Sequence, residues 1–358
     1  MDGTKIEWTD ATWNPVRGCS RVSEGCRNCY AERVAARFSG PGMPYEGLAR
    51  SARVARPDTR DVRVGGLGAE GIGYYVSTEP RWTGAVQLVV EHLYDPLRWR
   101  RPRRVFVNSM SDLFHEKVPD DWIDRIFAVM ALAPQHVFQI LTKRPERMRR
   151  WFTERTPDKT EPDRFGPWSA MDRVWGCMNP GDQQTHGAPE WPLLNVWLGV
   201  SCEDQETADE RIPILLDTPA AVRFVSAEPL LGPVDLRGLP IPGAPPAAAR
   251  DALNRAGISP PEAATALDWV IVGGESGPGA RPCDVAWVRL LVAQCRAAGV
   301  ACFVKQLGAF ILSDTPPSLV RDGAPAKYRA WIGRGKCGDP SKWPEDMRVR
   351  EFPKTEAT

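Results

Sequence analysis

The sequence predicts an α/β fold in which strands and helices alternate around a partial barrel. Six short, nearly continuous apolar runs are typical of parallel strands covered on both faces. They occupy residues 105–107, 137–141, 196–200, 222–225, 269–272 and 302–304. Apolar residues at helical spacing predict helices at 120–132, 206–216 and 285–298, and Gly299 is a natural stop for the last. This alternation favours a partial, TIM-like (β/α)6 barrel with long loop insertions, or else a doubly wound sheet.

Length and composition are those of an ordinary globular protein. The 358 residues suffice for one large α/β domain or two small ones, and the hydrophobic share of 42% can build a core of that size. No early apolar run is fit for a signal peptide, and no later stretch approaches the length that crosses a bilayer. We therefore expect a cytoplasmic protein with no membrane partner.

We expect one domain at residues 1–308, followed by a C-terminal extension at 309–358 that packs on the barrel. Three stretches between the predicted elements are rich in Pro together with Gly, Ala or charged residues, and none has the pattern of an independent domain. These predicted insertions cover about 39–81, 152–192 and 237–264.

The charge of the chain is balanced, at a net +1 from 46 basic and 45 acidic residues. The net charge therefore gives no indication of a nucleic-acid partner. Local basic runs occur at 98–104 and 143–150. We interpret most of them as solvated helix ends and loops, and a track for phosphates is the alternative.

Each predicted strand runs directly into a polar cluster. The clusters lie at residues 108–112, 142–145, 201–204, 226–229, 273–276 and 305–306. In parallel β/α folds the active site lies at the carboxyl ends of the strands. One cluster could be a turn with a helix cap, for example at Ser201 or Ser226. Six in a row, carrying two Lys, one Arg and three Glu, predict a polar cavity instead.

The cysteine pattern indicates a metal site. Nine cysteines is an odd number in a long chain without an export signal, so metal or catalytic use is a better prediction than a disulfide framework. Cys19, Cys26 and Cys29 form a C-x6-C-x2-C motif in a loop that also contains Gly18 and Gly25. A helix predicted at 30–38 follows, and its first amides can stabilise negative charge on sulfur.

The number of cysteines favours an iron–sulfur cluster over zinc. A structural zinc site usually has four protein ligands. Three thiolates leave one iron of a cubane open, and that iron can bind a substrate or cofactor. A zinc site completed by His92 or His115 is the alternative, and unligated structural cysteines are the third reading.

Several motifs together resemble the phage- and mobile-element-associated three-Cys-motif family, which is filed as a domain of unknown function. Besides the cysteine run, they are EWTDATWNP at 7–15, VNSMSDLF at 107–114, LTKR at 141–144, GGES at 273–276 and DPSKWPEDMRVREFP at 339–353. The resemblance covers nearly the whole chain.

More remotely, the chain is similar to radical S-adenosylmethionine enzymes, which place a three-cysteine loop after the first strand of a partial β/α barrel. The resemblance implies a 4Fe–4S cluster whose open iron chelates the amino and carboxylate groups of S-adenosylmethionine, and reductive cleavage to methionine and a 5′-deoxyadenosyl radical. The chain departs from the usual pattern: six residues rather than three separate the first two cysteines, and Asn28 occupies a usually aromatic position, with Tyr30 following.

This resemblance also implies roles for individual residues. Cofactor contacts are implied for Tyr30 on the adenine side, Asn108, Ser109 and Asp112 at the amino group, Ser201 and Glu203 at the ribose, and Gly273, Gly274 and Glu275 on the backbone side. The charged residues Lys143, Arg144 and Lys305 are then left for an anionic substrate or for charge balance, with Glu228 as an acid beside them.

Structural roles are alternatives for the charged residues. Arg144 could pair with Asp112 or Glu146, Lys143 could equally be structural, and Glu228 could be part of the cavity wall.

The leading functional hypothesis is a radical S-adenosylmethionine-like enzyme that uses a reductant protein and acts on nucleic acid or a nucleotide, as spore photoproduct lyase does. The alternative is a cluster- or zinc-containing protein that binds nucleic acid or a three-Cys-motif partner without radical chemistry. A third hypothesis is a degenerate barrel that no longer binds the cofactor.

Overall fold

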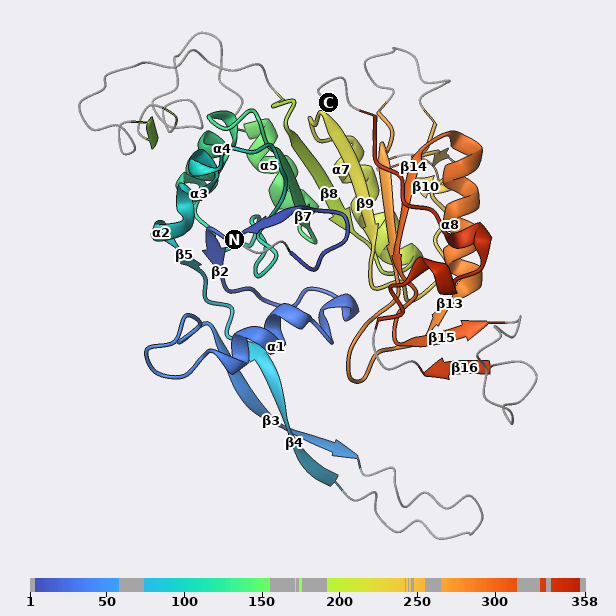
Figure 1. The fold of residues 1–358 in the computed structure, drawn as a ribbon, viewed down its shortest axis with the longest axis horizontal. Helices are drawn as coiled ribbons and strands as arrows, with labels where there is room; N and C mark the ends of the chain where they lie inside the picture. Colours follow the sequence, from blue (N-terminus) through green and yellow to red (C-terminus); the bar gives the residue numbers. More distant parts are fainter. Residues whose placement is uncertain are drawn as a thin grey trace.

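A curled sheet of seven parallel strands forms the centre of the fold (Figure 1). The structure is a computed structural model that describes residues 4–57, 74–154, 171, 174–175, 192–241, 243, 245, 248–254, 265–313, 329–332 and 336–354. In spatial order the strands are β1 (Ala11–Trp13), β6 (Arg104–Val107), β7 (Val137–Thr142), β8 (Val196–Ser201), β9 (Val222–Ala227), β12 (Trp269–Gly273) and β14 (Ala301–Gln306). All neighbours in this sheet are parallel. A doubly wound sheet requires the strand order to reverse, and the order in this sheet never does. The curled sheet is therefore a half-barrel.

Six of the seven strands are the predicted ones, which confirms the α/β class, and the curled sheet is compatible with the predicted partial barrel. Strand β1 was not predicted, because a three-residue strand with Thr12 at its centre has too short an apolar pattern to be recognised. Its pairing with β6, in which Trp13 lies opposite Val107, defines it as a strand.

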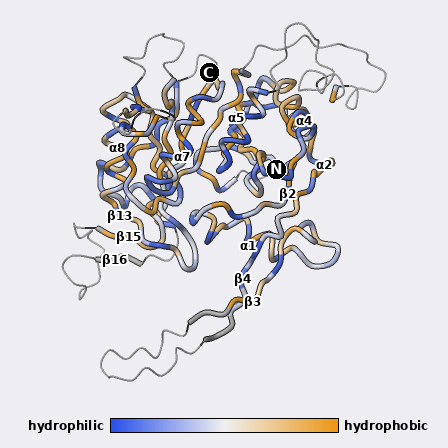
Figure 2. Tube along the Cα trace, turned by 180° about the vertical axis from the view of Figure 1, so that it is seen from behind, coloured by the Kyte–Doolittle hydropathy of each residue, from blue (hydrophilic) through white to orange (hydrophobic). Residues whose placement is uncertain are grey.

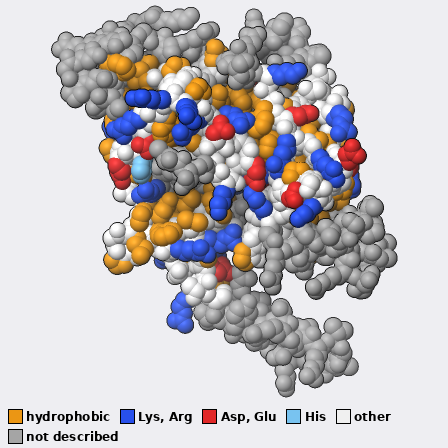
Figure 3. Space-filling view, in the orientation of Figure 1, with side chains coloured by type: hydrophobic (Ala, Val, Ile, Leu, Met, Phe, Trp, Pro, Cys, Tyr) orange, Lys and Arg blue, Asp and Glu red, His pale blue; other side chains and the backbone are white. Residues whose placement is uncertain are grey.

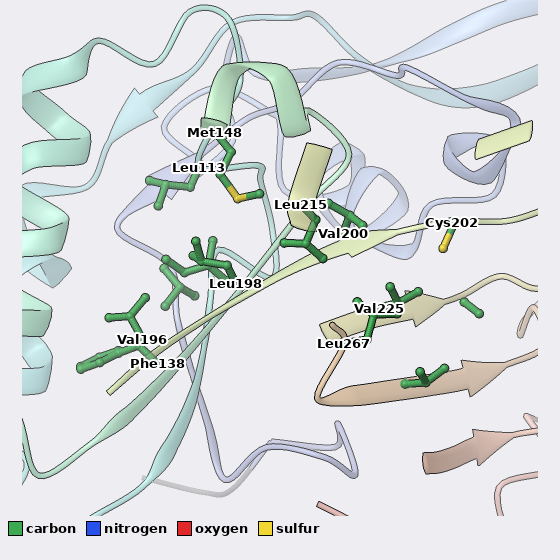
Figure 4. Close-up of a cluster of buried hydrophobic side chains, with 14 of the residues drawn as sticks. Leu113, Phe138, Met148, Val196, Leu198, Val200, Cys202, Leu215, Val225 and Leu267 are labelled. Atoms are coloured by element: carbon green, nitrogen blue, oxygen red, sulfur yellow. The ribbon is translucent and has the colours of Figure 1, made fainter. Parts of the chain in front are cut away.

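Four helices cover the outer face of the sheet (Figure 1). They are α4 (Asp120–Ala131), α5 (Pro145–Glu154), α7 (Gln205–Leu216) and α8 (Val285–Ala298). Figure 4 shows how they pack: Met148 of α5 and Leu215 of α7 lie beside Leu198 and Val200 of β8. Figure 2 shows the same distribution, with hydrophobic stretches concentrated in the sheet and its covering helices.

Local sequence sets the ends of these helices. Asp204 caps α7 in a capping box with Thr207, and Gly299 ends α8 with a φ of 70°, a conformation that glycine adopts at little cost. Helix α5 was not predicted, because its arginines obscure the apolar face formed by Met148 and Trp151. Within the described ranges, no helix is both long and apolar enough to cross a membrane.

Further elements surround the half-barrel. They are β2 (Val16–Arg17), η1 (Glu24–Cys26), α1 (Tyr30–Arg37), β3 (Ala49–Pro57), β4 (Tyr74–Trp82), β5 (Gln87–Leu88), α2 (Val90–Leu93), α3 (Asp95–Arg98), β10 (Leu239–Pro240), β11 (Ala249–Arg250), β13 (Cys283–Asp284), β15 (Phe310–Ser313), β16 (Arg329–Ile332), η4 (Pro340–Lys342) and η5 (Glu345–Met347). Strands β3 and β4 form an antiparallel hairpin that projects from the body in the predicted insertion at 39–81 (Figure 1). Most of the predicted insertion at 152–192 lies outside the described residues, as do parts of 237–264 and 309–358.

The C-terminal segment at 336–354 runs along the free edge of β14. Phe303 and Arg350 form an antiparallel bridge. The indole of Trp269 donates a hydrogen bond to the carbonyl of Glu351 at 2.8 Å, and the ring of Phe352 lies 5.2 Å from that of Trp269. The segment thereby covers a strand edge that would otherwise expose unpaired backbone groups.

The inner face of the half-barrel carries an aromatic layer. Trp197, Phe224, Trp269 and Phe303 point inward, and Trp8 of the N-terminal segment packs among them, 6.1 Å from the ring of Trp269. The residues next to them along each strand pack under the helices instead. Strand alternation therefore builds two separate cores, one inside the curl of the sheet and one outside it.

We expect Gly199→Ala to destabilise the fold by about 1–3 kcal/mol, the usual cost of overpacking. Gly199 of β8 faces the aromatic layer, and an added Cβ would lie 2.5 Å from the ring of Phe224. Urea unfolding measures the effect. Gly40→Ala is the control, because its Cβ would meet nothing closer than 3.5 Å. Equal stability of both variants would show that Phe224 moves aside freely.

Candidate functional site

A cavity of about 300 Å³ lies at the carboxyl ends of the strands. Most of the predicted site residues line it: Cys19, Cys26, Cys29, Tyr30, Asn108, Ser109, Asp112, Lys143, Arg144, Ser201, Glu228, Gly274, Glu275 and Lys305. Strand alternation explains the convergence. Ser226 lies two residues after the inward-facing Phe224, and Lys305 lies two after Phe303, so each continues the inner face past the aromatic layer. Glu203 and Gly273 do not line the cavity, and they contact residues that do: Glu203 pairs with Lys143, and Gly273 packs on Glu228.

The cysteine loop crosses this cavity. Gly18, with a φ of 91°, turns the chain into the loop at a point where a Cβ would collide with the carbonyl oxygen of Ala85. Cys26 ends the short helix η1, and the amide of Cys29 donates to the carbonyl of Cys26 at 3.3 Å. Cys29 is the N-cap of α1. This geometry places all three thiols on one wall of the cavity.

Burial dominates the electrostatics of two of the thiols. It raises the pKa of Cys19 to about 12, helped by the charge of Asp112 and opposed by that of Arg144. Burial also raises the pKa of Cys29, while the backbone amides of Glu32 and Ala31 at the start of α1 oppose the shift. A bound cation or cluster would relieve the desolvation of these sulfurs, because thiolates are its ligands.

The donor set fits an iron–sulfur cluster in kind and number. In the described part of the chain, no three His, Cys, Asp or Glu side chains are already arranged to hold a metal ion. The thiols share a wall, and rotation of their side chains would have to bring them onto a common centre. His92 hydrogen-bonds to Asp95 and His115 to Ser20, and neither lines the cavity.

Asn108 provides a second sign that the cavity holds a ligand. Its Oδ1 accepts a hydrogen bond from the amide of Val16 at 3.2 Å, which fixes the orientation of the side-chain amide. Its Nδ2 is buried and has no partner among the described residues. The residue also has a φ of 59°, a left-handed conformation that asparagine tolerates better than most residues. A buried donor on a cavity wall is satisfied by a water or by an acceptor atom of a ligand that binds there.

Asp112 and Arg144 fasten the cysteine loop to the sheet. The Arg144 guanidinium donates to Asp112 at 2.9 Å and to the Ser20 hydroxyl at 2.8 Å. Asp112 also accepts from the hydroxyl of Thr142 at 2.7 Å and from the amide of Lys143 at 3.2 Å. The ion pair expected as the structural alternative for Arg144 is therefore present, and the oxygens of Asp112 are already engaged.

Lys143 and Glu203 belong to a second buried network. The Lys143 ammonium lies 2.6 Å from Glu203 Oε1, and Arg211 of α7 lies 3.2 Å from Oε2. Gly25 packs so closely on the Glu203 carboxylate that any Cβ would overlap it. The network therefore holds the cysteine loop against β7 and β8.

Lys305 and Glu228 form a third pair, 3.0 Å apart. Gly273 packs against this carboxylate, since a Cβ there would lie 2.5 Å from Glu228 Oε1. Gly274 packs in the same way on the carbonyl of Leu307. Both glycines are thus explained by close packing within the protein.

Asn28, Glu32 and Arg281 contribute to the site and were not predicted from the sequence. Asn28 donates to Glu275 Oε2 at 2.9 Å, and Glu275 also binds Arg281, whose hydrogen bonds lower the pKa of that carboxyl below its usual range despite burial. Glu32, buried on α1, accepts from Arg21 at 2.9 Å and from the amide of Trp82 at 2.8 Å. The helical position of Glu32, three residues after Cys29, was the only sequence signal for it.

Comparisons with known proteins define a family without defining an activity. Neither the curated proteins nor the solved structures contain a match. A family model described as a protein of unknown function, DUF5131, matches residues 3–337. Since the match spans nearly the whole chain, the protein belongs to the DUF5131 family.

Proposed function

We propose that this protein is an iron–sulfur enzyme of the radical S-adenosylmethionine type. The observation that carries the proposal is the cavity at the strand ends, where three thiols and the unsatisfied amide of Asn108 face the same space. Cys19, Cys26 and Cys29 would hold a 4Fe–4S cluster with one open iron. The loaded site would supply reductive cleavage of a sulfonium and a carbon-centred radical.

The chain's own residues bind and orient the ligands. The free atom of Asn108 is a donor, so it fits a carboxylate or ribose oxygen of the cofactor better than an ammonium group. Ser109 and Ser201 offer hydroxyls on the same walls. The aromatic layer below the cavity, with Trp8 and Phe106 at its floor, excludes water from the reacting groups.

Anaerobic reconstitution with iron and sulfide, followed by S-adenosylmethionine and dithionite, tests the proposal. We expect about four irons per chain and release of 5′-deoxyadenosine. Asn108→Ala should keep the iron and weaken S-adenosylmethionine binding about tenfold, as expected for a lost hydrogen bond. One zinc per chain, or a cluster that does not respond to S-adenosylmethionine, would contradict the proposal and favour the non-radical alternative.

A further inference from the structure

A second hollow, of about 1070 Å³, lies on the outer side of the cysteine loop, between α1 and the β3–β4 hairpin. We call it the outer groove. Val22, Asn28, Cys29 and Arg33 line both the outer groove and the inner cavity. The wall between the two spaces is therefore one residue thick at Cys29, and a molecule in the outer groove lies directly beside the candidate metal centre.

One arginine that lines the outer groove has no acidic partner among the described residues. Of the groove's lining residues, Arg21 pairs with Glu32 and Arg81 with Glu79. Arg33, one helical turn after Cys29, is half-buried and has no ion-pair or hydrogen-bond partner for its side chain in the described ranges. Its guanidinium lies against the backbone of the loop at Gly277, where an added Cβ would come within 2.9 Å. A half-buried cation without a partner indicates an anionic ligand.

The hairpin adds a second unbalanced charge. Arg50 lies directly opposite Arg81 in the register of β3 and β4. Opposite residues of an antiparallel pair share a face, and this is the face of Val54 and Glu79, which line the outer groove. Arg81 is already paired with Glu79, whereas Arg50 is exposed and has no partner among the described residues. Arg50 is therefore a second cation available to an anion that extends from the groove onto the hairpin.

The surrounding segments share this charge. Residues 17–57 and 74–82 contain nine arginines, four glutamates and no lysine or aspartate, whereas the whole chain has a net charge of only +1. Figure 3 shows Lys and Arg side chains gathered where the hairpin joins the body of the molecule. The nine basic residues of these segments are all arginines, the type that binds phosphate in a fork.

We propose that the outer groove binds the phosphate backbone of single-stranded nucleic acid. The groove is recessed between two arginine-bearing walls, which suits a strand. Among the described residues, its lining has no aromatic anchors of the kind found in protein–protein interfaces, and its apolar side chains are Val22, Val54, Pro80 and Pro278. Because contacts to phosphate carry no sequence information, binding should be independent of base sequence. The inference deepens the proposed function by naming its substrate class, and only the chemistry that follows binding rests on that function.

Fluorescence anisotropy with a labelled 20-nucleotide single strand, titrated with the full chain between 50 and 200 mM NaCl, tests the proposal without cofactor or turnover. We expect Arg33→Gln combined with Arg50→Gln to weaken binding about tenfold or more. The slope of log affinity against log salt should fall in magnitude by about 0.7 for each arginine removed. Circular dichroism confirms that the variant is folded.

Arg237→Gln combined with Arg296→Gln is the matched control, because it removes the same charge from two exposed arginines that neither line the outer groove nor belong to the basic runs at 98–104 and 143–150. It should bind like the wild type. Equal weakening by both double variants, or no binding by the wild type, would overturn the proposal. Competition by poly-L-glutamate as effective as that of the oligonucleotide at equal charge would also overturn it, in favour of an acidic protein partner. Loss of 5′-deoxyadenosine formation with intact oligonucleotide binding would instead count against the proposed function alone.

Discussion

Replacement of Cys19, Cys26 or Cys29 by alanine is expected to reduce the iron retained after anaerobic reconstitution from about four atoms per chain to nearly none. Each thiol would supply one of three protein ligands, so any one replacement leaves only two cysteines to hold the cluster. The effect should be equally large at all three positions, because a cubane that loses a second ligand site is labile. Iron analysis and the visible absorption of the cluster measure it.

Cys295→Ala is the matched control for these variants. Cys295 is buried on α8 in the outer core and does not line the cavity. It should keep the iron while losing some stability to the removed core volume. If the Cys295 variant also lost its iron, or if one variant of the cysteine loop retained a full complement, the three-thiol centre would be wrong.

Replacement of Glu203 by alanine is expected to lower the free energy of unfolding by about 3–5 kcal/mol. The Glu203 side chain is 1% exposed, and it is the shared counter-ion of Lys143 and of Arg211, whose side chain is 3% exposed. Removing the carboxylate would leave Arg211 buried without that counter-ion, and Lys143, whose side chain is 18% exposed, unpaired on the cavity wall. Denaturant unfolding by circular dichroism measures the loss.

Two further variants identify the origin of that loss. Glu203→Gln keeps the volume and some hydrogen bonding but removes the charge, so it should recover only part of the stability. Glu206→Ala replaces an exposed glutamate in the first turn of α7 and should cost less than about 1 kcal/mol. A Glu203→Ala variant as stable as Glu206→Ala would mean that Lys143 and Arg211 are solvated without it.

The sequence predicts which strand ends surround the site better than it predicts which side chains contact each other within the site. Continuous apolar runs identify buried parallel strands, and parallel strands bring their carboxyl ends together, so the convergence of Asn108, Ser201 and Lys305 follows from chain order alone. Which charges pair there depends on distances across the barrel. Arg144 therefore lies on Asp112 rather than on Glu146, for a reason that no local pattern contains.

The cysteine loop shows the same limit. Its spacing predicted a shared centre, and the three thiols do line one cavity. The contacts that fix the loop are long-range, from Asn28 to Glu275 and from Glu32 to the amide of Trp82. The first strand of the hairpin that receives the second contact has Arg at every third position (50, 53 and 56) rather than an alternating apolar face, which is why the hairpin was predicted only as an insertion.

The aromatic layer has a consequence for the order of events in the cavity. Trp8 and Phe106 line the cavity, and the rings of Phe224 and Trp269 pack against Trp8, so the chamber is closed on the side of the aromatic layer. Molecules that share a blind chamber must enter in sequence, and the deepest leaves last. A small cofactor seated on the floor would therefore load before a polymeric substrate and be trapped until that substrate departs.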